Sequence, residues 1–155
     1  MFLLEFKERS MDIFYQQQNE KFDLISDNRL FKKLDVSHLM KPYLVLIEDK
    51  NKRTAICKLR LGSHNFNIER GRWNKPKTEL SERICEECLC LEDEYHIVVE
   101  CSRFSILRKQ LIPKHLISKP SMFKFIDFLN NVSGKELDNL ARFCIKVFTL
   151  YDKNI

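Results

Sequence analysis

Residues 85–101 read Cys-Glu-Glu-Cys-Leu-Cys-Leu-Glu-Asp-Glu-Tyr-His-Ile-Val-Val-Glu-Cys, which is a C-x2-C-x7-H-x4-C pattern. Two cysteines separated by two residues can hold one side of a tetrahedral ion from a single turn, and a second pair closes the site. The expected ion is Zn2+, and the predicted ligands are Cys85, Cys88, His96 and Cys101. Because four protein ligands leave no open position, we expect the zinc to be structural rather than catalytic.

Alternatives to this ligand set stay open. A Cys-x-x-Cys pair by itself is also the pattern of a redox-active dithiol, and it is the nearby His96 and Cys101 that favour zinc. Cys90 lies inside the pattern and could replace Cys88 or His96 as a ligand. The chain has six cysteines and no convincing secretory signal, which favours free thiols or metal ligands over a disulfide scaffold and predicts an intracellular protein.

The sequence on either side of this stretch has mostly helical periodicity. We predict a mostly α fold, a small helical domain with an embedded C2HC zinc module. The only strand-like run is Ile97-Val98-Val99. A length of 155 residues with 44% apolar composition fits a single domain over 1–155. Its predicted parts are N-terminal helices over 1–49, a basic helix and connector over 50–82, the zinc module and a following helix over 83–112, and C-terminal helices over 120–152.

Two helices have clear sequence signals. From Lys50 to Leu61 the apolar residues fall on one face and Gly62 follows as a stop, while Arg53 and Arg60, seven residues apart, are expected to point outward from the other face. Ser133 and Glu136 predict a capping box at the start of the last helix. Its apolar face would be Leu137, Leu140, Ala141, Cys144 and Phe148. Between these helices, residues 63–84 resemble an irregular connector with short turns, because Gly71 and Pro76 interrupt them.

The formal net charge of +5 is unevenly distributed. The window from Lys50 to Lys77 holds nine basic residues and one acid, a local charge of +8, so the other residues sum to −3. Such a basic face is suited to phosphate, although a solvated helix face would have the same composition. The residues expected to bind nucleic acid are Arg53, Lys58, Arg60, Arg70, Arg72, Trp73, Lys75 and Lys77.

Three further features have two interpretations each. Trp73 is either a plug between helices or a stacking platform for an unpaired base. His64 is either a capping or core residue or a second stacking group. The acidic run Glu92-Asp93-Glu94 is interpreted as a solvated charge cluster rather than as part of a nuclease site.

Two longer stretches resemble a known family. They are Lys58-Leu-Arg-Leu-Gly-Ser-His-Asn-Phe-Asn-Ile-Glu-Arg-Gly-Arg-Trp73 and Arg83-Ile-Cys-Glu-Glu-Cys-Leu-Cys-Leu-Glu-Asp-Glu-Tyr-His-Ile-Val-Val-Glu-Cys101, followed by Phe104 and Arg108. Together they are similar to the zinc-binding C-terminal region of animal non-LTR (LINE-type) retrotransposon polyproteins, downstream of the reverse transcriptase. The resemblance is specific over 50–111, looser over 22–49 and absent from the last 40 residues.

The family pattern maps onto this chain at Arg83, Cys85, Cys88, Glu92, Asp93, Glu94, His96 and Cys101. The chain departs from it at Ser102, where proline is frequent, and at Cys90. The resemblance implies a role in nucleic-acid handling beside a polymerase, in a nuclear or cytoplasmic ribonucleoprotein. A reverse transcriptase region of a larger polyprotein is the implied neighbour.

We expect the domain itself not to be an enzyme. It has no paired aspartates of the kind a polymerase needs, and His96 is not followed by the glutamate of a zinc deaminase. The predicted function is non-catalytic, zinc-dependent binding of RNA or DNA through the basic face. The alternative is a zinc-stabilised interaction domain that binds an acidic protein. We expect no membrane partner, because the apolar stretches are far shorter than a membrane span of about 20 residues. We also expect no small-molecule substrate.

Overall fold

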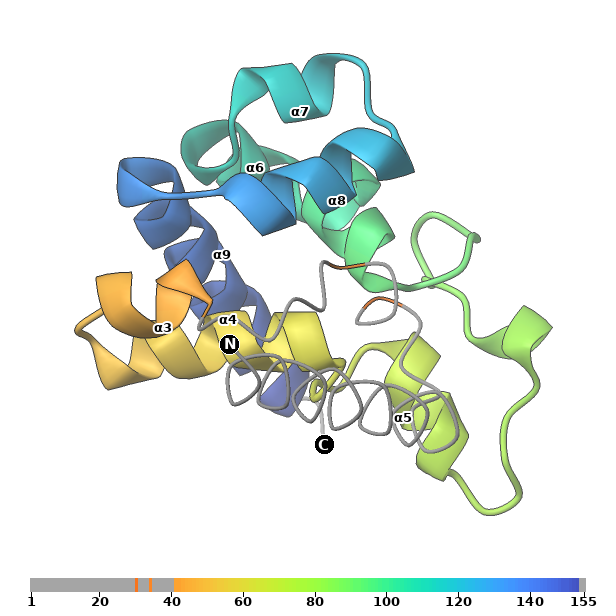
Figure 1. The fold of residues 1–155 in the computed structure, drawn as a ribbon. Helices are drawn as coiled ribbons and strands as arrows, with labels where there is room; N and C mark the ends of the chain where they lie inside the picture. Colours follow the sequence, from red (N-terminus) through yellow and green to blue (C-terminus); the bar gives the residue numbers. More distant parts are fainter. Residues whose placement is uncertain (1–29, 31–33, 35–40, 154–155) are drawn as a thin grey trace, which may run out of the picture.

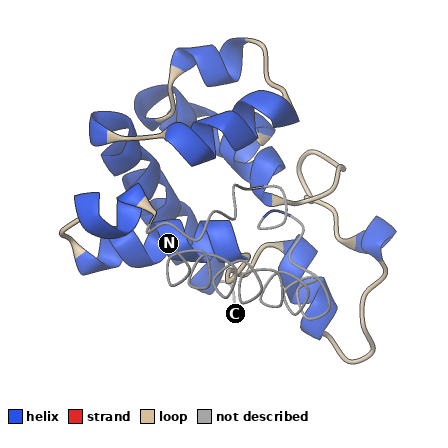
Figure 2. Ribbon diagram, viewed as in Figure 1, coloured by secondary structure: helices blue, strands red, loops and turns tan. Residues whose placement is uncertain are grey.

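A computed structural model describes Leu30, Leu34 and residues 41–153 of the chain. Within these residues all named elements are helical, which confirms the predicted mostly α fold (Figure 2). Apart from α3 (Pro42–Leu46), the helices predicted over 1–49 lie outside the described residues. Ile97-Val98-Val99 lies in a π-helical turn, η2 (His96–Glu100), and not in a strand. No helix in the described part of the chain is long and apolar enough to cross a membrane.

The basic helix begins and ends as predicted. Helix α4 (Lys50–Leu61) is preceded by Asp49, whose carboxylate accepts from the backbone N–H groups of Asn51 and Lys52 at 2.8 and 3.1 Å. Gly62 ends it with φ 62°, a left-handed conformation that glycine adopts without strain. The predicted apolar face is buried and packs against the long C-terminal helix α9 (Gly134–Asp152).

The prediction that Arg53 and Arg60 point outward is wrong. Arg60 is 5% exposed and donates to the carbonyl oxygen of Leu129 at 2.6 Å. Arg53 is half-buried and donates to the Ile47 carbonyl at 2.7 Å. Both acceptors lie at the C-terminal ends of helices, where carbonyl groups lack intrahelical partners and carry partial negative charge. The shared helical face is real, but neighbouring helix ends cover it.

Helix α9 packs against both α4 and α6 (Ser105–Leu111). In Figure 1 it descends from the upper left and passes behind α4, with α7 (Lys114–Ser118) and α8 (Met122–Asn131) toward the top of the view, α3 at the left and α5 (Asn67–Trp73) at the lower right. The predicted apolar face of α9 is buried as expected. The predicted capping box does not form, because the Ser133 side chain makes no capping hydrogen bond. An ion pair at 2.6 Å between Lys52 of α4 and Asp138 of α9 joins the two helices near this end of α9.

The connector is more ordered than predicted. It contains α5 and a short 3-10 turn, η1 (Leu80–Glu82), and a second 3-10 turn, η3 (Ser102–Phe104), follows the cysteine-rich stretch. Gly71, interpreted from sequence as a break, lies inside α5, and the Arg83 side chain packs against its backbone. Residues 74–79 form a loop that extends away from the helices (Figure 1).

Candidate metal centre

The Cys85–Cys88 pair is presented by one tight loop. The Cys85 N–H donates to the carbonyl of Cys90, and the Leu89 N–H donates back to the carbonyl of Cys85, both at 2.8 Å. An isolated antiparallel bridge between Ile84 and Leu91 closes the base of the loop. Leu89 turns the chain with φ 55°, a conformation that costs a residue with a side chain some strain. This loop, residues 83–91, which we call the metal loop, brings both cysteine side chains to the same side.

The second pair is presented by the π-helical turn η2. The Asp93 carboxylate accepts from the His96 N–H at 2.8 Å, which holds the start of the turn. The Cys101 N–H donates to the His96 carbonyl at 2.7 Å, an i to i+5 bond that ends it. The turn thereby brings His96 and Cys101 into the same cluster, and π turns are rare and frequent at functional sites.

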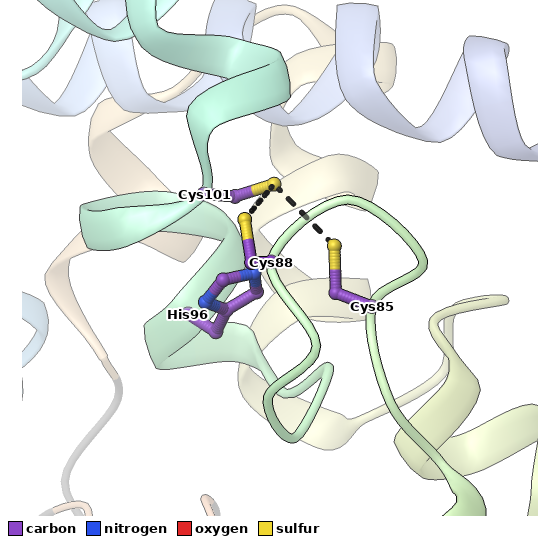
Figure 3. Close-up of side chains that lie close together, drawn as sticks. All are labelled: Cys85, Cys88, His96 and Cys101. Carbon is purple, nitrogen blue, oxygen red and sulfur yellow. Dashed lines mark hydrogen bonds between the residues drawn. The ribbon is translucent and has the colours of Figure 1, made fainter.

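The structure brings the four predicted ligands together (Figure 3). Their donor atoms all lie within 4.8 Å of one another. The Cys101 sulfur is 3.8 Å from the Cys85 sulfur and 4.0 Å from the Cys88 sulfur. Two thiolates bound to one tetrahedral zinc at about 2.3 Å would be about 3.8 Å apart. The cluster could therefore hold one metal ion with little rearrangement, and Cys85, His96 and Cys101 are buried within it.

Cys90 lies beside this cluster but outside it. Its side chain is exposed, and its sulfur is 3.2 Å from His96 Nδ1 and 3.8 Å from His96 Nε2. The Glu100 carboxylate lies near the same nitrogen, 3.8 Å from His96 Nδ1. Cys90 is thus a neighbour of the histidine, and the group of four that could hold the ion does not include it.

Two cysteines of the cluster have pKa values shifted in opposite directions. Burial raises the pKa of the Cys101 thiol to about 12, because the thiolate loses its hydration. Hydrogen bonds from the Ser102 hydroxyl and N–H lower the pKa of Cys88, whose sulfur lies 3.3 Å from Ser102 Oγ. A bound cation would supply the stabilisation that the buried Cys101 thiolate otherwise lacks.

The interpretation of Glu92-Asp93-Glu94 as a solvated cluster is wrong. Glu92 and Glu94 are 4% and 7% exposed. Glu92 accepts from the Asn67 N–H at 2.8 Å, which fixes the start of α5, and Glu94 lies 3.0 Å from His64 Nε2. His64 is accordingly a core residue, with its ring centroid 4.0 Å from that of Phe66. These acids connect the metal loop to the core of the domain.

Sequence reasoning missed the role of Arg108. Its buried guanidinium donates to the carbonyl oxygens of Val98 at 2.9 Å, Ile97 at 3.2 Å and Cys101 at 2.6 Å. These carbonyls belong to the turn that carries His96 and to the cysteine that follows it. Its position four residues after Phe104, on the apolar side of the predicted helix, was the available signal.

Five of the predicted nucleic-acid-binding residues lie together in a segment that we call the basic arm, residues 70–77. It holds Arg70, Arg72, Lys75 and Lys77 and no acid. Arg70, Lys75 and Lys77 are exposed, and Trp73 is 77% exposed, so Trp73 is not a plug between helices. Arg72 pairs with Glu69 at 2.8 Å. Lys58 is exposed on α4, outside the arm, while Arg53 and Arg60 contact helix ends.

The arm is closed at its base and joined to the metal loop. The Thr78 N–H donates to the Gly71 carbonyl at 2.9 Å. The buried Arg83 side chain donates to the Ile68 carbonyl, which precedes the arm, at 3.0 Å, and to the Thr78 carbonyl, which follows it, at 2.8 and 3.0 Å. Arg83 is two residues before Cys85, so the residue that fixes both ends of the arm also begins the metal loop.

Comparison of the chain with protein-family models, with curated proteins and with solved structures gives no match.

Proposed function

We propose that Cys85, Cys88, His96 and Cys101 hold a structural Zn2+. The donor set supports this choice, because three thiolates and one imidazole in a tetrahedral cluster suit zinc better than oxygen-preferring magnesium or calcium. Four protein ligands fill the coordination sphere, which leaves no position for a substrate. The ion would then act by fixing the loop from which Arg83 reaches the arm.

We propose that the domain binds RNA or DNA through the basic arm. The observation that carries this proposal is the exposure of Arg70 in α5 and of Lys75 and Lys77 in the loop that follows it, in an arm whose base is fixed beside the metal loop. Among the residues that the structure describes, no carboxylate pairs with Lys58, Lys75 or Lys77. Such cations replace the counterions of a phosphate backbone, which is the main source of sequence-independent affinity.

We propose a supporting rather than a catalytic role, and the structural use of three acidic side chains beside the cluster supports this proposal. Glu92 and Glu94 are engaged by Asn67 and His64, and Asp93 caps the turn at His96. The resemblance of residues 50–111 to the C-terminal region of LINE-type polyproteins supports nucleic acid as the partner. In this proposal the chain acts beside a reverse transcriptase region, in a nuclear or cytoplasmic ribonucleoprotein.

The test is a binding panel of single-stranded, duplex and structured RNA and DNA at several salt concentrations. We expect the triple variant Arg70→Ala/Lys75→Ala/Lys77→Ala to bind all of them more weakly. Its slope of log affinity against log salt should be smaller by about 2–3, at about 0.7–0.9 per phosphate contact. The matched control removes three exposed cations elsewhere, Lys109, Lys135 and Lys146, and should change the slope little.

An acidic protein partner is the competing outcome of this panel. A surface built for a folded acidic protein predicts weak binding to every nucleic acid and no difference between the two triple variants. That result would replace nucleic acid by a protein as the ligand of the arm.

A further inference from the structure

The basic arm carries the only tryptophan of the chain, and that tryptophan is 77% exposed. A tryptophan side chain buries 150–250 Å2 when it packs, so leaving it in water forgoes a large apolar contribution. Trp73 ends α5, at the point where the chain leaves the helices and enters the extended loop (Figure 1). The side chain is therefore available to a ligand.

We infer that Trp73 is a stacking platform for an unpaired base and that the ligand of the arm is a single-stranded nucleic acid. The inference rests on the proposed nucleic-acid binding and adds the strand state of the ligand. Every base has a π face that can stack on an indole ring, and this contact requires a base outside a duplex. A duplex offers the arm its phosphates and groove edges, but its base faces are covered by their neighbours.

The surroundings of Trp73 supply both parts of such a ligand site. Arg70, Lys75 and Lys77 are exposed within four residues of it and can contact the phosphates that flank a stacked base. The Arg72 guanidinium carbon lies 5.9 Å from the Trp73 ring centroid, and its Nη1 is held by Glu69 at 2.8 Å. A cation near an indole ring at this distance favours a fixed ring orientation, which lowers the entropy that stacking would cost.

Trp73 also provides its own probe, because tryptophan fluorescence of this chain comes from one residue. We would titrate the zinc-loaded full chain with an unstructured oligothymidylate and with a duplex of equal length, at one salt concentration. Stacking predicts strong quenching by the single strand and little quenching by the duplex.

The variant Trp73→Leu should weaken single-strand binding by about 5- to 150-fold while leaving duplex binding within about 2-fold of the parent. The slope of log affinity against log salt should stay unchanged, because no cation is removed. Trp73→Phe keeps an aromatic face and should recover part of the loss. The Arg70→Ala/Lys75→Ala/Lys77→Ala variant should instead bind both the single strand and the duplex more weakly than the parent does.

The outcomes separate this inference from the proposed function. Equal, salt-dependent binding of both ligands without quenching, and unchanged in Trp73→Leu, would overturn the stacking platform and leave nucleic-acid binding in place. A lower melting temperature of Trp73→Leu with equal loss for both ligands would make Trp73 structural and also overturn it. If the parent binds neither ligand, the proposed function fails and the inference fails with it.

Discussion

The side chain of Arg83 packs so closely against Gly71 that a Cβ on Gly71 would lie 2.7 Å from Arg83 Cγ, Cδ and Nε. Glycine is an unfavourable residue inside a helix, by about 0.8–1.0 kcal/mol relative to alanine. Its presence in α5 is explained by this contact, because any other residue would push Arg83 away from the carbonyls at the base of the arm.

Gly71→Ala should therefore destabilise the domain, by about 1–3 kcal/mol as for other overpacked sites. Urea unfolding measures the change. The matched background is Arg83→Ala, which removes the atoms that the new Cβ meets. In that background Gly71→Ala should be neutral or stabilising, since alanine is the better helix former. An equal cost in both backgrounds would contradict the packing of Arg83 on Gly71.

The ligand assignment predicts a sharp difference between two neighbouring side chains. His96→Ala should lose the bound zinc and unfold the metal loop, whereas Cys90→Ser should retain one zinc per chain, because Cys90 lies outside the group of four. Structural zinc contributes on the order of 10–16 kcal/mol in small peptides, which is comparable to the about 5–15 kcal/mol that holds a whole domain. Elemental analysis measures the zinc content, and circular dichroism measures the unfolding. Zinc loss in Cys90→Ser with retention in His96→Ala would reverse the assignment.

Arg108 predicts an effect on metal binding from outside the ligand set. Arg108→Met leaves three buried carbonyl groups without their donor and should destabilise the domain by about 1–3 kcal/mol. It should also weaken zinc binding by about 10- to 100-fold, as expected for the loss of a group that holds the ligands in position. A competition titration with a chelating dye measures the affinity. Lys109→Met, at an exposed position next to it, should change neither quantity.

The backbone of the metal loop offers a stabilising substitution. Leu89 has φ 55° and a side chain that is 75% exposed, so replacing it removes strain and little packing. Leu89→Gly should raise the stability of the zinc-loaded domain by up to about 1 kcal/mol, because the relief of strain exceeds the added chain entropy of glycine. Leu89→Val should lower it, since a branched side chain tolerates this conformation poorly. Thermal unfolding should give the highest melting temperature for Leu89→Gly, an intermediate one for the parent and the lowest for Leu89→Val.

The clustering of Cys85, Cys88, His96 and Cys101 could be predicted from sequence because their spacing is short and the chemistry of cysteine and histidine is specific. The C-terminal end of α4 could be predicted for a similarly local reason, because Gly62 follows an apolar face and adopts the left-handed conformation that ends a helix. Arg60, Arg83 and Arg108 could not be placed from charge. Each is buried by donating to backbone carbonyls. Which carbonyls lack partners depends on how distant helices end against one another.

The exposure of Trp73 could not be predicted from sequence either. A large aromatic residue next to a helical segment favours burial, so sequence alone could not decide between a plug and a surface group. The helix α5 was missed because Gly71 indicates a break in the local pattern, whereas the residue that requires it, Arg83, lies 12 positions later. Tertiary packing decided both positions.

We propose that an ion in the Cys85, Cys88, His96 and Cys101 cluster fixes the basic arm for nucleic-acid binding. The most direct measurement is the affinity of the full chain for a single-stranded oligonucleotide at constant salt before chelation, after chelation and after zinc is restored. We predict that chelation releases one zinc per chain and abolishes binding, and that added zinc restores both. A chain that contains no zinc when folded, or that binds the oligonucleotide equally well after its zinc is removed, would show that no ion fixes the arm.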